Sequence, residues 1–237
     1  MISDAPPPYR AIVFDCDSTL SAIEGIDELA REHKTEIAEL TDRAMKGELA
    51  LEAVYARRLA IVRPSRNAID DVGALYVARM LPHARELVAA AHALKKRVCI
   101  VSGGLLPAVL KLARALSIHE RDVFAVDVRF DAQGNYTGFD EASPLARTGG
   151  KIEVVGRIAS SAGGGVCLVG DGATDLEAAS STARFIAFGG VVRRENVFAR
   201  SRITCEKADL AALAPLVFSA AEVEVLREKP EHSALFR

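Results

Sequence analysis

The sequence predicts an α/β protein: a doubly wound, Rossmann-like parallel sheet as the core, with an inserted helical cap domain and a small β-hairpin insertion. Short apolar runs at 11–14, 98–101, 166–169 and 184–188 are typical of strands buried on both faces of a sheet. Long segments with apolar residues at three- and four-residue spacing separate several of these runs. Strands that alternate with helices favour a parallel sheet.

The segment after the first strand carries no strand signal. Residues 24–80 hold four helical stripes, which start near Ile26, Ile37, Leu51 and Ile69. Pro64 ends the third stripe, and Ser65 is placed to cap the fourth. We therefore predict a helical cap at 21–80, inserted into an α/β core made of 1–20 and 81–237.

The rest of the chain continues the core. Pro82 is placed to open a helix at its first position, and a second helical stripe starts at Leu106. Alternating residues on both sides of 131–135 predict a hairpin after the apolar run 123–130. We expect a loose tail after Arg227.

Composition limits the function classes. The 237 residues include 30 Lys and Arg against 32 Asp and Glu, so the net charge is 30 − 32 = −2. A near-neutral chain lacks the basic face of a general nucleic-acid binder. A hydrophobic share of 50% and a charged share of 26% are typical of a globular protein. The sequence shows neither a membrane-spanning apolar run nor a signal core at its start, so we expect a cytoplasmic protein, monomeric or homodimeric, without a membrane partner.

Cysteine and histidine usage argues against zinc chemistry. The four cysteines form no CxxC pair, and we expect buried, reduced thiols. The five histidines show no HExxH spacing, which excludes a zincin.

Acidic residues follow the first predicted strand. Asp15 and Asp17 are two apart, so both side chains project in the same direction beyond the carboxyl end of the strand. Ligands bind at that edge of open α/β sheets. Two carboxylates so close need a cation, a shared proton or a reacting group between them. The alternative is a pair of solvated turn residues that end the strand.

A second acidic group follows the strand at 166–169. Asp171 and Asp175 stand among glycines that permit a tight turn. Asp171 and Asp15 together offer the oxygen ligands that suit Mg²⁺. Asp175 is placed to hold Asp171 or a metal-bound water through a hydrogen bond. An Asx turn that caps the next helix is the alternative, above all for Asp175.

Two further turns offer groups that bind phosphate. Ser102 and Gly103 follow the strand at 98–101, where a hydroxyl and free backbone N–H groups can hold a phosphate. Lys151 starts a helix after Thr148-Gly149-Gly150 and can donate to a phosphoryl oxygen. Each signal alone is also that of a helix cap or a surface lysine. The chain has no GxxxxGK[ST] and is therefore not a P-loop protein.

Together these four segments resemble the haloacid dehalogenase superfamily of phosphatases. Asp15-Cys16-Asp17-Ser18-Thr19 matches its DxDx[ST] motif, and Ser102, Lys151 and 170–175 match the other three motifs. The resemblance implies that Asp15 is the nucleophile, which forms an aspartyl phosphate, and that Asp17 is the general acid and base. It also implies Mg²⁺ held by Asp15, the Asp17 backbone carbonyl and Asp171, with Asp175 in support.

Within that superfamily the chain looks like the phosphoserine phosphatases over most of its length. The similar segments include 24–30, 43–47, 58–62, 135–139 and 188–190. The resemblance implies that Glu24 binds the substrate ammonium, that Arg58 binds its carboxylate, and that Met45 and Thr174 also contact the substrate. A helix-terminal acid and a solvated or salt-bridged arginine are the alternatives for Glu24 and Arg58.

The chain departs from the phosphoserine phosphatases at two positions. Leu105 stands where an aromatic residue usually follows the SGG turn, and Val126 stands where those enzymes usually carry Asn. We expect both residues near the site, where they would make the pocket more apolar.

The favoured function is hydrolysis of phosphoserine for serine biosynthesis. Three alternatives remain: a phosphatase of another small phosphomonoester, a phosphotransferase that passes the phosphoryl group to an alcohol such as homoserine, and a phosphoacceptor like the receiver domains of response regulators. The helical insertion argues against a receiver domain, since a signalling aspartate needs no lid over a substrate.

Overall fold

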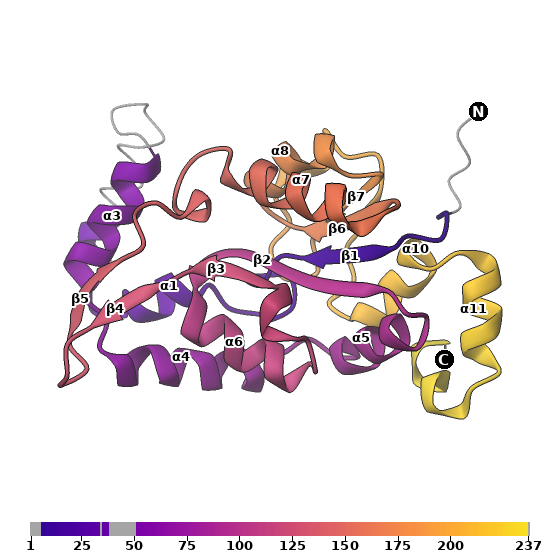
Figure 1. Ribbon diagram of the computed structural model, residues 1–237, viewed down its shortest axis with the longest axis horizontal. Coiled ribbons are helices and arrows are strands. Elements are labelled where there is room, and N and C mark those ends of the chain that lie inside the picture. Colours follow the sequence, from indigo (N-terminus) through magenta and orange to yellow (C-terminus); the bar gives the residue numbers. More distant parts are fainter. Residues whose placement is uncertain (1–5, 34, 38–50, 237) are drawn as a thin grey trace.

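The computed structural model describes residues 6–33, 35–37 and 51–236 (Figure 1). Its main sheet is six-stranded, with the order β3-β2-β1-β6-β7-β8. Every pair in this sheet is parallel. The six strands are β1 (Ala11–Phe14), β2 (Arg97–Leu105), β3 (Val123–Val126), β6 (Val166–Gly170), β7 (Arg184–Phe188) and β8 (Thr204–Cys205). This arrangement confirms the predicted fold class.

Helices cover both faces of this sheet. Alternate residues of β1 divide between two buried clusters, with Ile12 and Phe14 in one and Ala11 and Val13 in the other. The first cluster includes residues of α5 (Ala84–Ala93) and α6 (Leu106–Ala115), and the second includes residues of α7 (Gly150–Ala162) and α8 (Ala173–Ala178). In Figure 1 these two pairs of helices lie on opposite sides of β1, as expected for a doubly wound sheet.

The inserted segment is mainly helical where the structure describes it. It contains α1 (Gly25–Leu29), the 3-10 turn η1 (Arg31–His33), α3 (Leu51–Val62) and α4 (Arg66–Ala78). Ser65 caps α4 as predicted, because its side chain accepts a hydrogen bond from the Ala68 N–H at 3.2 Å. Of the stripe predicted from Ile37 to Gly47, residues 38–47 lie outside the described residues.

The predicted hairpin is formed by β4 (Val128–Phe130) and β5 (Tyr136–Phe139), which pair antiparallel. The turn between them is held by Asp131, whose carboxylate accepts from the Asn135 N–H and side-chain amide. The hairpin extends towards α3, where the rings of Tyr55 and Phe139 meet edge to face at 5.4 Å.

The C-terminal part adds elements that the sequence patterns did not predict. These are α9 (Glu195–Phe198), α10 (Ala214–Val217) and α11 (Ala220–Arg227). The expected loose tail after Arg227 is wrong: Pro230–Phe236 form the 3-10 segment η6, in which His232 and Leu235 are buried. The short apolar run of Ala234, Leu235 and Phe236 gave too weak a signal to predict this docking.

Two predicted boundaries also need correction. Pro82 is not the first residue of its helix, because α5 begins at Ala84 after His83, whose φ is +58°. The strand predicted at 98–101 continues to Leu105, so Ser102 and Gly103 lie in the last part of β2. All four cysteines are buried, free thiols, as predicted.

Candidate active site

Asp15 lies at the end of β1 and is buried. Its N–H continues the ladder to the Val169 carbonyl at 2.9 Å, which fixes the backbone at this sheet edge. Its Oδ1 accepts from the Cys16 N–H at 2.8 Å and lies 2.9 Å from the Lys151 Nζ. The side chain therefore meets a cation rather than solvent, which argues against a simple turn residue.

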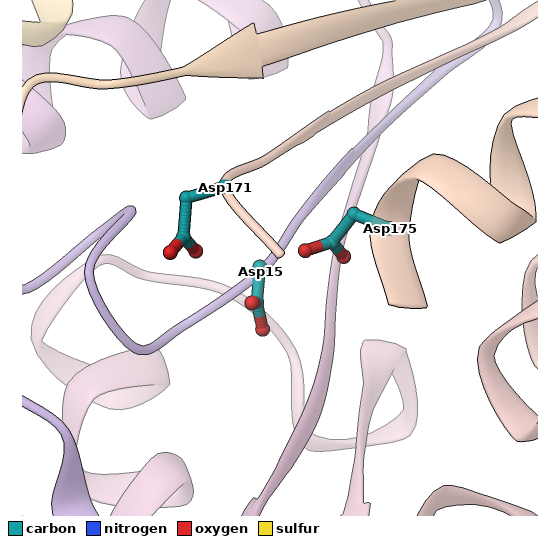
Figure 2. A group of neighbouring side chains, drawn as sticks. All are labelled: Asp15, Asp171 and Asp175. Carbon is teal, nitrogen blue, oxygen red and sulfur yellow. The ribbon is translucent and has the colours of Figure 1, made fainter. Parts of the chain in front are cut away.

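Asp171 and Asp175 come to the same place from the turn between β6 and α8. Carboxylate oxygens of Asp15, Asp171 and Asp175 lie within 4.8 Å of one another, and all three residues are buried (Figure 2). A Cβ at Gly170 would come within 2.3 Å of the Asp175 Cγ, so glycine is needed for this close approach. Burial and the nearby Asp15 raise the pKa of Asp171 above its usual value.

Lys151, in the first turn of α7, is the buried cation of this cluster. Its Nζ lies 2.7 Å from the Asp175 Oδ1 as well as 2.9 Å from Asp15. Burial alone would lower its pKa, but the charges of Asp15 and Asp175 outweigh burial and raise it. Lys151 is therefore a permanent positive charge next to the proposed nucleophile.

Asp17 occupies a different environment from Asp15. Its Oδ1 accepts from the Gly25 N–H and from the Tyr76 hydroxyl, each at 2.6 Å, and its Oδ2 accepts from the Ser102 hydroxyl at 3.2 Å. Burial, followed by the charge of Asp15, raises the pKa of Asp17 to about 6. Two neighbouring aspartates with unlike surroundings are the arrangement that allows one to attack and the other to move protons.

Ser102 and Gly103 lie between Asp17 and the segment that carries α3. The Ser102 hydroxyl accepts from the Gly104 N–H at 2.9 Å, and the Gly103 carbonyl accepts from the Tyr55 hydroxyl at 2.9 Å. Gly103 lines the same cavity as Asp15, Lys151 and Asp171. Ser102 is fully buried beside Asp17 and is not part of the lining, so of these two predicted phosphate-binding residues only Gly103 lines the cavity.

Glu24 and Thr174 also line this cavity. Glu24 accepts from the Ser18 hydroxyl at 2.7 Å and pairs with the Arg194 guanidinium at 3.2 Å. Burial, followed by the charge of Asp17, raises the pKa of Glu24 to about 7. Arg194 donates through Nε to the Asp171 Oδ2 at 2.9 Å, so it links the proposed amine-binding residue to the acidic cluster.

Arg58 reaches the cavity from α3 and forms an ion pair with Asp27. Its side chain is 24% exposed, while that of Asp27 is 60% exposed, so the guanidinium lies on the inner side of the pair. Its Nε is buried and makes no hydrogen bond within the described residues. Met45, the remaining predicted substrate contact, lies outside the described residues.

The two departures from the phosphoserine phosphatase pattern do not face the cavity. Leu105 is 3% exposed and Val126 is fully buried, both within the main hydrophobic cluster. Neither residue belongs to the cavity lining. The expectation that they make the pocket more apolar is therefore wrong, because β2 and β3 turn these side chains into the core.

Tyr55, Tyr76 and Arg194 are among the residues close to the site that were not predicted as site residues. Tyr76 follows Val72 at helical spacing, which predicts only a core position. Arg194 stands next to Arg193, and the sequence does not tell which of the two turns inward. The sequence offered one signal nearby, the likeness of Phe188-Gly189-Gly190 to known enzymes, and this signal did not single out Arg194.

Comparison with known proteins agrees with this geometry. A family model described as haloacid dehalogenase-like hydrolase matches residues 12–180. The chain belongs to this family, and it is a phosphoric monoester hydrolase.

Individual similar proteins point to one group of enzymes within this family. The chain is 39% identical over 190 residues to the phosphoserine phosphatase of Rattus norvegicus, a match that covers 79% of this chain and 84% of the rat protein. Among solved structures, a phosphoserine phosphohydrolase-like protein from Francisella tularensis matches with a TM-score of 0.76 and 26% identity, covering 88% of this chain and 100% of that one. A phospho-aspartyl intermediate analogue of phosphoserine phosphatase matches with a TM-score of 0.70 and 28% identity, covering 90% and 100%. No helix among the described residues is long and apolar enough to cross a membrane.

Proposed function

We propose that this protein is a Mg²⁺-dependent phosphoserine phosphatase, which hydrolyses O-phospho-L-serine to L-serine and phosphate through an aspartyl phosphate and serves serine biosynthesis. The observation that carries the proposal is the position of Asp15, which is buried against Lys151 and close to Asp171 in a cavity that also holds Glu24 and Arg58. The similarity to phosphoserine phosphatases supports the choice of substrate.

In the first step, a carboxylate oxygen of Asp15 attacks phosphorus and the bond from phosphorus to the serine oxygen breaks. We assign the attack to Oδ2, because Lys151 and the Cys16 N–H both meet Oδ1. Asp17 gives its proton to the departing oxygen, which completes L-serine. A carboxyl with a pKa raised to about 6 still holds a useful share of protons near neutral pH.

In the second step, water attacks the phosphorus of the aspartyl phosphate. Asp17, now ionised, takes a proton from this water, and the bond from phosphorus to Asp15 breaks to release phosphate. Lys151 reduces the repulsion between the dianionic substrate and the nucleophile in both steps. The Ser102 hydroxyl and the backbone at Gly103 hold the phosphoryl oxygens.

The acidic cluster fits a divalent metal ion. Its donors are carboxylate oxygens, which Mg²⁺ prefers, and three buried carboxylates within 4.8 Å repel one another unless positive charge offsets them. We assign the metal to Asp15, the Asp17 carbonyl and Asp171, and we assign support to Asp175, whose carboxylate already holds Lys151 and the Gly172 N–H. When bound, the ion would polarise the phosphoryl oxygens and neutralise developing charge.

Glu24 and Arg58 would recognise the amino-acid end of the substrate. A carboxylate suits an ammonium group, and a guanidinium suits a carboxylate. We place Met45 and Thr174 at the same end, and we propose that residues 21–80 act as a cap that excludes water from the cavity. Asp27 would release Arg58 when the substrate carboxylate arrives.

The test is phosphate release from a panel of phosphomonoesters with Mg²⁺, with the Asp15→Asn variant as control. We expect phosphoserine to exceed sugar phosphates in kcat/KM, and we expect Asp15→Asn to be folded and inactive. Equal rates on phosphoserine and sugar phosphates would reject the substrate. Homoserine phosphate formed on addition of homoserine would indicate a phosphotransferase, and a stable phosphoenzyme without turnover would indicate a phosphoacceptor.

A further inference from the structure

We infer that Tyr76 is a positioning residue for the acid–base carboxyl of Asp17, a role that rests on the function proposed above. The Tyr76 hydroxyl and the Gly25 N–H both donate to Asp17 Oδ1, each at 2.6 Å. Oδ2 accepts one longer hydrogen bond, from the Ser102 hydroxyl at 3.2 Å. Since two donors hold Oδ1, Oδ2 is the oxygen that gives a proton to the leaving group and later takes one from water.

Tyr76 is well suited to this task because its own position is fixed. The residue is 1% exposed, and its backbone carbonyl accepts from the Ser21 hydroxyl at 3.0 Å. The helix that carries it, α4, is packed closely on α6: a Cβ at Gly73 would come within 2.7 Å of the Lys111 Cδ. The Lys111 Nζ also pairs with the Asp70 carboxylate at 2.6 Å. The hydroxyl therefore reaches Asp17 from a rigid framework.

Glycines leave room for this hydroxyl on two sides. A Cβ at Gly25 would lie 2.1 Å from the Tyr76 Oη, which would force the ring away from Asp17. A Cβ at Gly104 would lie 3.2 Å from the Asp17 Oδ2 and 3.3 Å from the Tyr76 Oη. The contact thus depends on a tyrosine on one helix and on glycines in two other segments. This complementarity is independent evidence that the arrangement is specific.

The inferred role predicts a dependence on the leaving group. Serine leaves as a poor alkoxide and needs a proton from Asp17, whereas p-nitrophenolate leaves without one. Hydrolysis of the aspartyl phosphate needs Asp17 as a base for both substrates. A defect in orienting Asp17 should therefore slow both steps for phosphoserine, but only the second step for p-nitrophenyl phosphate.

The experiment compares the wild type with Tyr76→Phe, which removes only the hydroxyl. We expect kcat for phosphoserine to fall about tenfold or more, a part of the roughly 10²–10⁴-fold that general acid–base catalysis supplies. With p-nitrophenyl phosphate, rapid mixing should show a burst of nitrophenolate close to one equivalent at the wild-type rate, followed by slow turnover.

Tyr55→Phe is the matched control. It also removes a tyrosine hydroxyl from the inserted segment, one that donates to the Gly103 carbonyl rather than to Asp17. We expect this variant to change both substrates by a similar factor and to produce no new burst. If both variants lower kcat by a similar factor with both substrates, the Tyr76 hydroxyl serves only packing and the inference fails.

Gly25→Ala keeps the inference testable if Tyr76→Phe does not fold. Its Cβ would displace the Tyr76 hydroxyl, so the same burst and the same loss with phosphoserine are expected; a uniform loss would contradict the role. A failure of the proposed function looks different, because the wild type itself would then not prefer phosphoserine, or Asp15→Asn would remain active.

Discussion

Replacing Lys151 by methionine tests whether a buried cation holds the acidic cluster together. The Lys151 Nζ lies 2.7 Å from the Asp175 Oδ1 and 2.9 Å from the Asp15 Oδ1. The three side chains are 9%, 0% and 10% exposed, so solvent screens these pairs poorly. Removing one partner of a buried ion pair costs about 3–5 kcal/mol because it leaves a buried charge uncompensated. We expect Lys151→Met to lower the free energy of unfolding by about that amount at pH 8.

The loss should depend on pH with a defined sign. In the folded protein the pKa of Asp175 is raised to about 7, chiefly by burial and then by Asp15, while Lys151 lowers it. When the pKa of a carboxyl is higher in the folded than in the unfolded protein, the group favours folding at low pH. This contribution to the free energy of unfolding is complete below the unfolded-state pKa and is lost as the pH rises through the folded-state pKa. Without Lys151 the pKa of Asp175 rises further. At low pH Asp175 is then protonated in the variant, which leaves no uncompensated buried charge at this residue. The difference from the wild type should therefore be larger at pH 8 than at pH 5.

Urea unfolding in the presence of a chelator, at pH 5 and pH 8, measures this difference without bound metal. The Lys151→Met/Asp175→Asn double variant is the control, since Asn keeps the shape of Asp without its charge. If charge is the cause, the double variant should be less destabilised than the sum of the single variants. An equal loss at both pH values, together with additive single variants, would refute the electrostatic reasoning and leave only packing.

Three further predictions follow from the site and its supports. Glu24→Gln and Arg58→Ala should reduce kcat/KM for phosphoserine more than for an aryl phosphate. Equal losses in phosphate-release assays would mean that these residues do not bind the ammonium and carboxylate groups of the substrate. Gly150→Ala should destabilise the fold by about 1–3 kcal/mol or more, because its Cβ would lie 1.6 Å from the Pro144 carbonyl oxygen; Gly156→Ala, on the same helix with 3.7 Å of clearance, is the control in thermal unfolding. Removal of divalent ions by a chelator should abolish phosphate release and lower Tm, and added Mg²⁺ should restore both; activity that persists in the chelator would exclude the metal requirement.

The sheet edge that carries the candidate site could be predicted from the sequence, because the position of this edge follows from the sheet topology. The carboxyl ends of parallel strands share one edge, so polar residues that follow buried apolar runs must meet there. This reasoning needs no side-chain packing, and it brought Asp15, Ser102 and Asp171 together. Lys151 and Asp175 followed because each stands in the first turn of a helix at that same edge.

The contacts made by helices and loops could not be predicted in this way. Tyr76 occupies a core position of α4, as its spacing predicts, but the partner of its hydroxyl depends on how α4 packs on α6. Arg194 and Arg193 are neighbours in a loop. Arg193 packs over the Phe198 ring at 4.8 Å, while Arg194 turns inward to Asp171. Such choices depend on the packing of distant segments, which no local pattern encodes.

We therefore propose different tasks for helices α3 and α4 of the inserted segment. The α4 part shares the buried cluster of β2 and α6, and it brings Tyr76 to Asp17 from a fixed position. The α3 part joins the same cluster through Leu59, contacts Gly103 through Tyr55, and brings Arg58 to the cavity, where its side chain pairs with exposed Asp27. An exposed ion pair contributes little to stability, so its exchange for a substrate carboxylate costs little. Under the proposed function, recognition of the amino acid would therefore involve exchange of the Arg58–Asp27 ion pair, while Asp17 stays hydrogen-bonded to Tyr76 and Gly25.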